Sequence, residues 1–204
     1  MPRALISGFE PFGGASVNAS FEAVRRLPGR IGTLDITTLQ LPTSYARASK
    51  VLLDAIARVD PVLVLCVGEA GERTALNIER VAINVQDARI ADNDGAQPVD
   101  LPIVDGAPAA YFTTLPVRAI HESLAAAGLS SAISNSAGTF VCNHLFYTLM
   151  QFALTENKRL RGGFLHVPCW RSDTAATPNG TPPMILADIV RGLTIVLEAS
   201  AATI

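Results

Sequence analysis

The sequence is poor in cysteine and in charge, and both shortages exclude classes of protein. Its 204 residues include only Cys66, Cys142 and Cys169, an odd and sparse set that argues against a disulfide framework and favours a reducing compartment. Charged residues make up 17% of the chain, against 49% hydrophobic residues. At a net charge of −2 no basic block stands out, so the electrostatic footprint of a nucleic-acid-binding protein is missing.

The chain also lacks long apolar runs and metal-binding motifs. No run approaches the length that spans a bilayer, and the apolar stretch at the N-terminus is too short for a signal peptide. There is no CxxC, no HxxxH and no cluster of carboxylates with ligand spacing, so we expect no metal site. These absences leave a cytoplasmic enzyme or binding domain, without a membrane or nucleic-acid partner, as the expected class.

What the chain does contain is an alternation of strand-like and helix-like segments. Apolar or β-branched runs predict strands at Arg3–Gly8, Leu34–Leu41, Val62–Val67, Thr74–Val85, Ser131–Ser134 and Gly163–Val167. Helical spacing predicts helices from Asn18 or Ser20 to about Leu27, over Ser44–Val59 and Pro116–Ala127, from about Phe140 to Leu154, and over Met184–Ala199. Loops are expected at Asp87–Pro108, with a short hairpin, and at Asp173–Pro183. The alternation predicts one three-layer α/β domain over residues 1–204, with a largely parallel sheet.

The most informative segment is SAGTFVCNHLFY at residues 136–147, which places Cys142 just inside a predicted helix start. Unpaired backbone N–H groups and the positive end of the helix dipole favour a thiolate at such a position. Cys142 is therefore a candidate nucleophile. Cys66, in an apolar strand, and Cys169 are expected to be inert.

A nucleophilic cysteine needs a base, and the chain offers three histidines. His144 is two residues from Cys142 and should face away from it on a helix, and His121 is expected to be an ordinary helix-edge residue. His166 lies in an apolar strand, where it is either a satisfied core histidine or the base of a Cys–His pair.

Glu79 is the candidate for the group that orients this histidine. Alternation along its strand places the carboxylate on an apolar face, which is costly unless the charge is paired. Two interpretations stay open: a buried ion pair, for example with Arg89, or the acid that holds His166 in the required tautomer.

These residues stand in motifs that together resemble the pyroglutamyl peptidase family. The motifs span most of the chain in the family's order: GFEPFGG at 8–14 followed by Asn18, GEAGER at 68–73 where the family usually has a GQAGGR-like run, IERVAIN at 78–84, DARIADNDGAQP at 87–98, SAGTFVCNHLFY at 136–147 and GFLHVP at 163–168. The resemblance implies an α/β/α sandwich around a twisted, mostly parallel sheet. It also implies a cytosolic cysteine peptidase without cofactors that removes pyroglutamate from peptide N-termini, and that assembles as a homo-oligomer, in several members a tetramer.

Carried over residue by residue, the resemblance implies Cys142 as nucleophile, His166 as base and Glu79 as its orienting acid. It further implies that Arg89 assists the Cys142 backbone N–H as an oxyanion donor. The expected substrate-binding residues are Phe9, Phe12, Asn18, Glu69, Phe140 and Val141.

Two departures from the family pattern matter. Glu69 stands where the family usually has Gln; a carboxylate accepts a hydrogen bond from the lactam N–H but donates none to a carbonyl. The run over 169–184 also differs from the usual one. The alternatives are therefore a diverged member or same-fold hydrolase or phosphorylase with an altered substrate, or an inactive ligand-binding module.

Overall fold

The computed structural model describes residues 1–170 and 184–204, so the predicted loop Asp173–Pro183 lies outside the described residues. Its strands are β1 (Arg3–Phe9), β2 (Arg30–Ile31), β3 (Leu34–Leu41), β4 (Leu63–Glu69), β5 (Leu76–Glu79), β6 (Val81–Ile83), β7 (Ala110–Phe112), β8 (Ser131–Ser134) and β9 (Arg161–Val167). Its helices are α1 (Ala19–Val24), α2 (Ala48–Val59), α3 (Val117–Ala126), α4 (Val141–Thr155) and α5 (Leu186–Ala201). The predicted order of strands and helices is confirmed for the segments that the structure describes.

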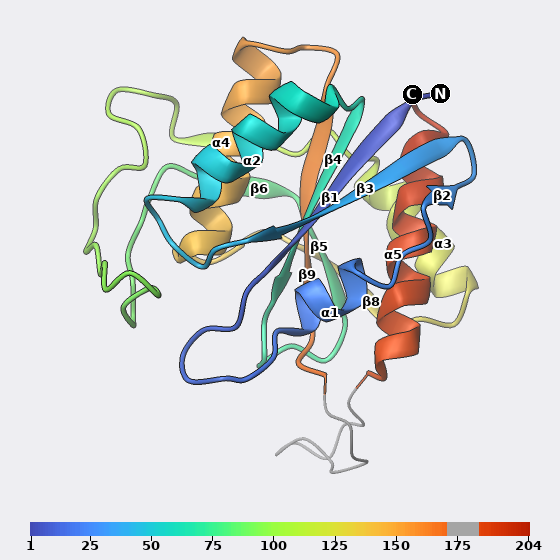
Figure 1. Cartoon of the computed structure of the whole chain (residues 1–204), viewed down its shortest axis with the longest axis horizontal. Coiled ribbons are helices and arrows are strands. Elements are labelled where there is room, and N and C mark those ends of the chain that lie inside the picture. The colour runs from blue at the N-terminus through green and yellow to red at the C-terminus, as the bar shows by residue number, and fades with distance from the viewer. Residues whose placement is uncertain (171–183) are drawn as a thin grey trace.

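The sheet is mixed but mostly parallel, in the order β2-β3-β1-β4-β9-β5-β8. The central strands β3, β1, β4 and β9 pair in parallel, whereas β2 runs antiparallel to β3 and β5 runs antiparallel to β9. The strands fan out across the view with the twist of an open sheet (Figure 1). The prediction of a twisted, mostly parallel sheet is confirmed.

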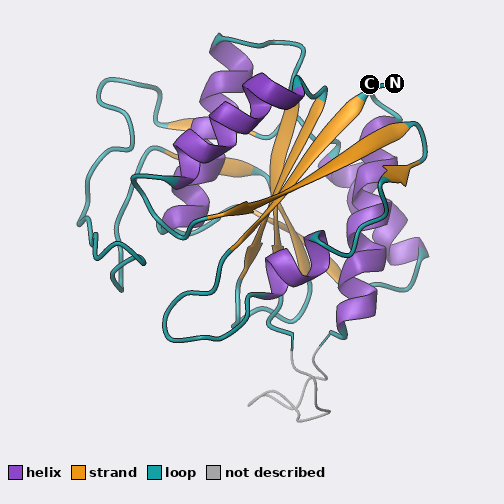
Figure 2. Cartoon of the chain, viewed as in Figure 1, coloured by secondary structure: helices purple, strands orange, loops and turns teal. Residues whose placement is uncertain are grey.

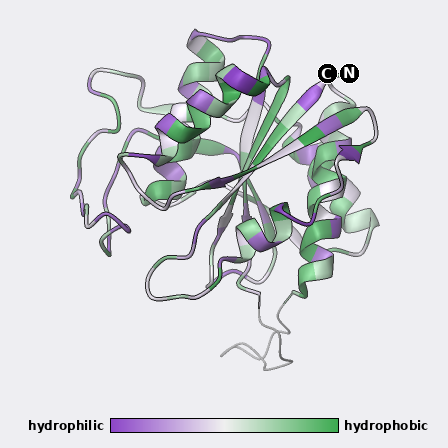
Figure 3. Cartoon of the chain, viewed as in Figure 1, coloured by the Kyte–Doolittle hydropathy of each residue, from purple (hydrophilic) through white to green (hydrophobic). Residues whose placement is uncertain are grey.

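Helices cover both faces of this sheet, which gives three layers (Figure 2). Helices α2 and α4 pack on one face, and α1, α3 and α5 pack on the other. Each face has its own core of buried aliphatic and aromatic side chains, and hydrophobic colouring gathers on the central strands and on the helices over them (Figure 3). Burial on both faces explains why β1 and β4 are almost continuously apolar.

The structure corrects two details of the predicted elements. Thr74–Val85 is not one strand: β5 ends at Glu79 and β6 begins at Val81, and the two strands belong to different sheets. Strand β6 pairs instead with β7 in a small antiparallel sheet. The loop over 87–108 forms no pair of strands in the described residues; Gln86 and Leu101 make an isolated antiparallel bridge, and the Ala88 N–H donates to the Pro98 carbonyl at 2.8 Å.

The fold gathers several chain segments at one edge of the sheet. Parallel strands β1, β4 and β9 end there at Phe9, Glu69 and Val167, and the first turn of α4 lies against the same edge. Ligand sites of open α/β sheets lie beyond the carboxyl ends of such strands. In the described part of the chain, none of the helices is both long and apolar enough to pass through a bilayer.

Candidate active site

The sulfur of Cys142 lies directly over Gly68. A Cβ atom built on Gly68 would stand 2.8 Å from Cys142 Sγ and 2.8 Å from Cζ of Phe164, both far inside contact distance. Helix α4 places Cys142 at its second residue, and Gly68 leaves the space that the sulfur fills. Gly68 also pairs with His166 across the parallel β4–β9 ladder, so the strand partner of this glycine is the candidate base.

His166 is held by a buried carboxylate. Its Nδ1 lies 2.7 Å from Oε1 of Glu79, and both side chains are almost completely buried. Strand β5 delivers Glu79 because it runs antiparallel to β9, with Glu79 opposite Phe164. This pairing joins two residues that are far apart in the sequence.

Arg73 is a third member of this cluster that sequence reasoning missed. Its Nη1 donates to Glu79 Oε1 at 2.6 Å, and its Nη2 donates to the Ser136 carbonyl at 2.9 Å. The ion-pair partner of Glu79 is therefore Arg73, and the suggested pairing with Arg89 is wrong. The signal that could have found it is the need of any buried carboxylate for a nearby cation. The other oxygen of Glu79, Oε2, is buried without a partner in the described residues.

Burial sets the protonation of the pair. It raises the pKa of the Cys142 thiol to about 12, aided by Glu79 and Cys66 and opposed by Arg73 and by the backbone N–H of Cys142 itself. Burial also lowers the pKa of His166, against the raising effect of Glu79. Burial thus acts on the Cys142 pKa in the opposite direction to the helix start, whose backbone N–H lowers it. With the pKa of the thiol raised and that of the imidazole lowered, attack needs a proton transfer from Cys142.

Cys142 and His166 line one cavity of about 130 Å³. All six residues expected to bind substrate line it as well: Phe9, Phe12, Asn18, Glu69, Phe140 and Val141. Thr43 and Ala137 complete the wall and were not predicted from the sequence. The cavity is small and mostly apolar, with its polar groups supplied by a few side chains, which suits a flat, uncharged ring.

The Gly-rich segment after β1 presents its aromatics to this cavity. The Phe12 and Phe140 rings lie 6.0 Å apart between centroids, and Phe9 packs near Phe164 at 6.5 Å. Gly13 and Gly14 have positive φ values of 61° and 83°, which glycine adopts without strain. The geometry fits the interpretation of a tight turn that presents aromatics.

Glu10 joins the loops that enclose the cavity. Its backbone carbonyl accepts from Asn18 Nδ2 at 3.1 Å and from Thr43 Oγ1 at 3.0 Å. Its carboxylate oxygen Oε1 accepts from the Thr43 backbone N–H at 3.1 Å and from Asn93 Nδ2 at 2.9 Å. Asn18 also caps α1 by accepting from the Ser20 N–H. The loops after β1 and β3 and the segment around Asn93 are thus fixed to one another.

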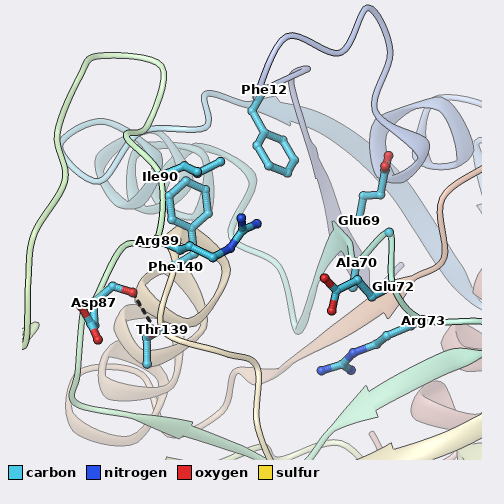
Figure 4. Close-up of a pocket in the computed structure, with 11 residues that line it drawn as sticks. Phe12, Glu69, Ala70, Glu72, Arg73, Asp87, Arg89, Ile90, Thr139 and Phe140 are labelled. Carbon is cyan, nitrogen blue, oxygen red and sulfur yellow. Dashed lines mark hydrogen bonds between the residues drawn. The ribbon is translucent and has the colours of Figure 1, made fainter.

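Glu69 lines the cavity of Cys142 as the sequence suggested, whereas Arg89 does not. Glu69 Oε2 accepts from the Ala19 N–H at 2.6 Å, and burial raises the pKa of its carboxyl. Arg89 lines an adjoining cavity of about 390 Å³, where its guanidinium extends between Phe140 and Glu72 (Figure 4).

The other candidate groups lie apart from the reaction centre. His144 Nδ1 lies 3.2 Å from Gln86 Oε1 and its ring packs edge-on against Tyr45, consistent with its predicted orientation away from Cys142. Cys66 is fully buried in β4, and Cys169 is partly exposed beyond β9. Within residues 1–170 and 184–204, no group of three or more His, Cys, Asp or Glu side chains could hold a metal ion.

Comparison with known proteins identifies relatives along the full length of the chain. A family model described as pyroglutamyl peptidase matches residues 2–203. The chain is 49% identical over 201 residues to pyrrolidone-carboxylate peptidase 1 of Ralstonia nicotianae, covering 98% of this chain and 93% of the relative. It is 45% identical over 199 residues to pyrrolidone-carboxylate peptidase of Alkaliphilus oremlandii, covering 97% and 92%.

Solved structures agree with these relatives. The crystal structure of pyroglutamyl peptidase I from Bacillus amyloliquefaciens matches with a TM-score of 0.93 at 43% identity, covering 99% of this chain and 98% of that one. Pyrrolidone carboxyl peptidase from Thermococcus litoralis matches with a TM-score of 0.90 at 36% identity, covering 99% and 94%. Both the sheet and the surrounding helices are therefore shared with these enzymes.

Proposed function

The chain belongs to the pyroglutamyl peptidase family, and we propose that Cys142, His166 and Glu79 carry out the family reaction in it. The protein is a cysteine peptidase that removes N-terminal pyroglutamate from peptides. The observation that carries the assignment of residues is the cavity that contains both Cys142 and His166, with His166 Nδ1 bound to Glu79. The alternatives of a phosphorylase or an inactive binding module are not favoured by these relatives.

The first half of the reaction forms a thioester. With Nδ1–H donating to Glu79, the neutral imidazole presents the lone pair of Nε2, which takes the proton of the Cys142 thiol as Sγ attacks the pyroglutamyl carbonyl. The C–S bond forms and the carbonyl oxygen becomes an oxyanion. When this intermediate collapses, the C–N bond breaks and the proton on His166 passes to the leaving amine.

The second half releases pyroglutamate. Water gives a proton to His166 and attacks the thioester, the C–S bond breaks, and the proton returns from His166 to the sulfur. Glu79 stabilises the imidazolium that forms in each half, and Arg73 fixes the position of Glu79. Because burial raises the pKa of the Cys142 thiol and lowers that of His166, we propose that the proton passes to His166 as the sulfur attacks rather than before it.

The oxyanion is proposed to bind at the start of α4. The first backbone N–H groups of a helix have no partner within the helix, and the N–H of Cys142 is among them. Arg89 is the proposed second donor. From its position in the adjoining cavity it would reach the oxyanion across the rim formed by Phe12 and Phe140.

A pair of fluorogenic amides tests the substrate class. Under reducing conditions, we expect release of the fluorophore from the pyroglutamyl amide and not from the prolyl amide, whose ring lacks the lactam carbonyl. Equal rates for the two amides would contradict recognition of pyroglutamate in the cavity.

Glu69→Gln is expected to improve recognition of pyroglutamate. A neutral amide keeps an acceptor for the Ala19 N–H, adds a donor for the lactam carbonyl and removes a charge from a partly closed cavity. We expect KM for the pyroglutamyl amide to fall about 2- to 10-fold, the range of one hydrogen bond. Because burial raises the pKa of Glu69, the parent enzyme carries this charge only above that raised pKa. The gain should therefore grow as pH rises through it.

Glu69→Ala is the matched control, since it removes the charge together with the hydrogen bond to Ala19. It should bind the substrate less well than the Gln variant. A Gln variant with an unchanged or higher KM across the pH range would contradict this view of Glu69.

We also propose that the protein works as a homo-oligomer in the cytoplasm. All three cysteines are free, which supports a reducing compartment. Large apolar side chains are exposed at Val99, Leu101 and Phe112, and such residues gather at subunit interfaces. A monomeric mass in light scattering would argue against the assembly, and recovery from the cell envelope would argue against the location.

A further inference from the structure

A second cavity opens beside the one that holds Cys142. The two cavities share Phe12, Glu69 and Phe140, all of which are partly exposed, so these residues form an open rim between them. The second cavity is the larger, at about 390 Å³ against about 130 Å³, and contains neither Cys142 nor His166. It can therefore hold a part of the substrate that does not react.

A third cavity is excluded as the continuation of the catalytic one. It shares Phe9 and Asn18 with the cavity of Cys142, but these two residues are only 2% and 3% exposed. They form a closed wall between the cavities rather than an opening. Among the cavities lined by residues that the structure describes, the larger one past Phe12 and Phe140 therefore offers a way out for a peptide whose first ring lies beside Cys142.

The charges around the larger cavity are unequal. Glu69, Glu72 and Asp87 supply carboxylates, and Arg73 and Arg89 supply guanidinium groups. The charge of Arg73 is matched by Glu79, which lies outside this cavity. The charge of Arg89 is therefore outnumbered by the carboxylates of this cavity. The cavity thus favours a positively charged ligand.

Glu72 is the acid that projects into this space. Its carboxylate extends into the cavity opposite the Arg89 guanidinium, whereas the Asp87 side chain lies at the edge near Thr139 (Figure 4). Glu72 is also exposed, so its carboxylate stays charged in the free enzyme without the free-energy cost of burying it, and a ligand can reach it.

We propose that the larger cavity is the subsite for the residue that follows pyroglutamate, and that Glu72 makes this subsite favour a cationic side chain over an anionic one. The proposal rests on the proposed peptidase function and adds the second residue of the substrate to it. Glu72 acts here as a specificity-determining residue and takes no part in bond making or breaking.

The test compares the peptide amides pyroglutamyl-Lys, pyroglutamyl-Glu and pyroglutamyl-Ala, with kcat/KM measured from the released amine. We expect the parent enzyme to prefer the Lys over the Glu substrate by about 2- to 5-fold at low salt, the range of exposed charge pairs, and less at high salt. Glu72→Gln should bring the Lys/Glu ratio close to one, and Glu72→Lys should invert it. The Ala substrate carries no side-chain charge, so its kcat/KM in each variant is the reference for the Lys and Glu values.

Glu122→Lys is the matched control, because it changes the net charge equally from an exposed position on α3. Its Lys/Glu ratio should equal that of the parent. An unchanged ratio in Glu72→Lys, or an equal change in Glu122→Lys, would overturn the subsite. Failure of the parent to cleave the Ala substrate would instead overturn the peptidase function on which the subsite rests.

Discussion

Cys142→Ala should lower kcat for a pyroglutamyl amide by about 10⁴-fold or more, which corresponds to over 5 kcal/mol of transition-state stabilisation. The variant loses the only atom that forms the thioester, while the cavity and the aromatic walls stay in place. Initial rates under reducing conditions, together with mass spectrometry of the quenched enzyme, measure both effects. The parent should accumulate a pyroglutamyl adduct and the variant should not.

Cys169→Ala is the matched control for this loss. Cys169 is another free, partly exposed thiol beyond the end of β9, and it does not line the catalytic cavity. Its variant should retain the activity of the parent within about twofold, as expected for a surface substitution. If Cys169→Ala lost as much activity as Cys142→Ala, or if Cys142→Ala still formed the adduct, the nucleophile would be misassigned.

Glu79→Gln is expected to lower kcat by roughly 10²- to 10⁴-fold, because a neutral amide no longer stabilises the imidazolium that forms on His166. The pH profile should move as well. Glu79 raises the pKa of His166, so its loss lets burial lower that pKa further. The acidic limb of kcat/KM, which reports protonation of His166, should therefore move to lower pH even as the rate falls.

Arg73→Met should shift the pH profile in the opposite direction to Glu79→Gln. Arg73 lowers the pKa of His166, so its removal should move the acidic limb to higher pH. The groups that shift the pKa of Cys142 or His166 are Cys66 from β4, Glu79 from β5 and Arg73 from the β4–β5 loop. Shifts in the same direction for Glu79→Gln and Arg73→Met would contradict the electrostatic roles given to these two residues.

Local patterns were sufficient to predict the layers and the position of Cys142. Continuous apolar runs such as Val62–Val67 predict strands covered on both faces, and the chain does form a sheet between two helical layers. The start of α4 at Val141 follows from the same kind of short-range pattern. Parallel strand ends then place the loops after β1 and β4 at one edge.

Strand pairings across long stretches of chain could not be predicted from local pattern. Strand β5 is antiparallel to β9, and this register brings Glu79 to His166, a contact that the family resemblance implied but the spacing alone left open. The split at Arg80 was hidden because β5 and β6 read as one alternating run. The effect of burial on the pKa of Cys142 also could not be predicted, since helix position is visible in a sequence and the surroundings of a side chain in the fold are not.

Gly68 couples two positions of the chain that sequence would treat as independent. Its backbone does not adopt the left-handed conformation that favours glycine, so conformation alone would admit other residues there. The sulfur of Cys142 and the ring of Phe164 are what exclude a side chain. Shortening residue 142 to alanine removes one of those two obstacles. The substitutions tolerated at position 68 therefore depend on the residue at 142. Such epistasis means that β4 can vary at this position only to the extent that the nucleophile leaves room.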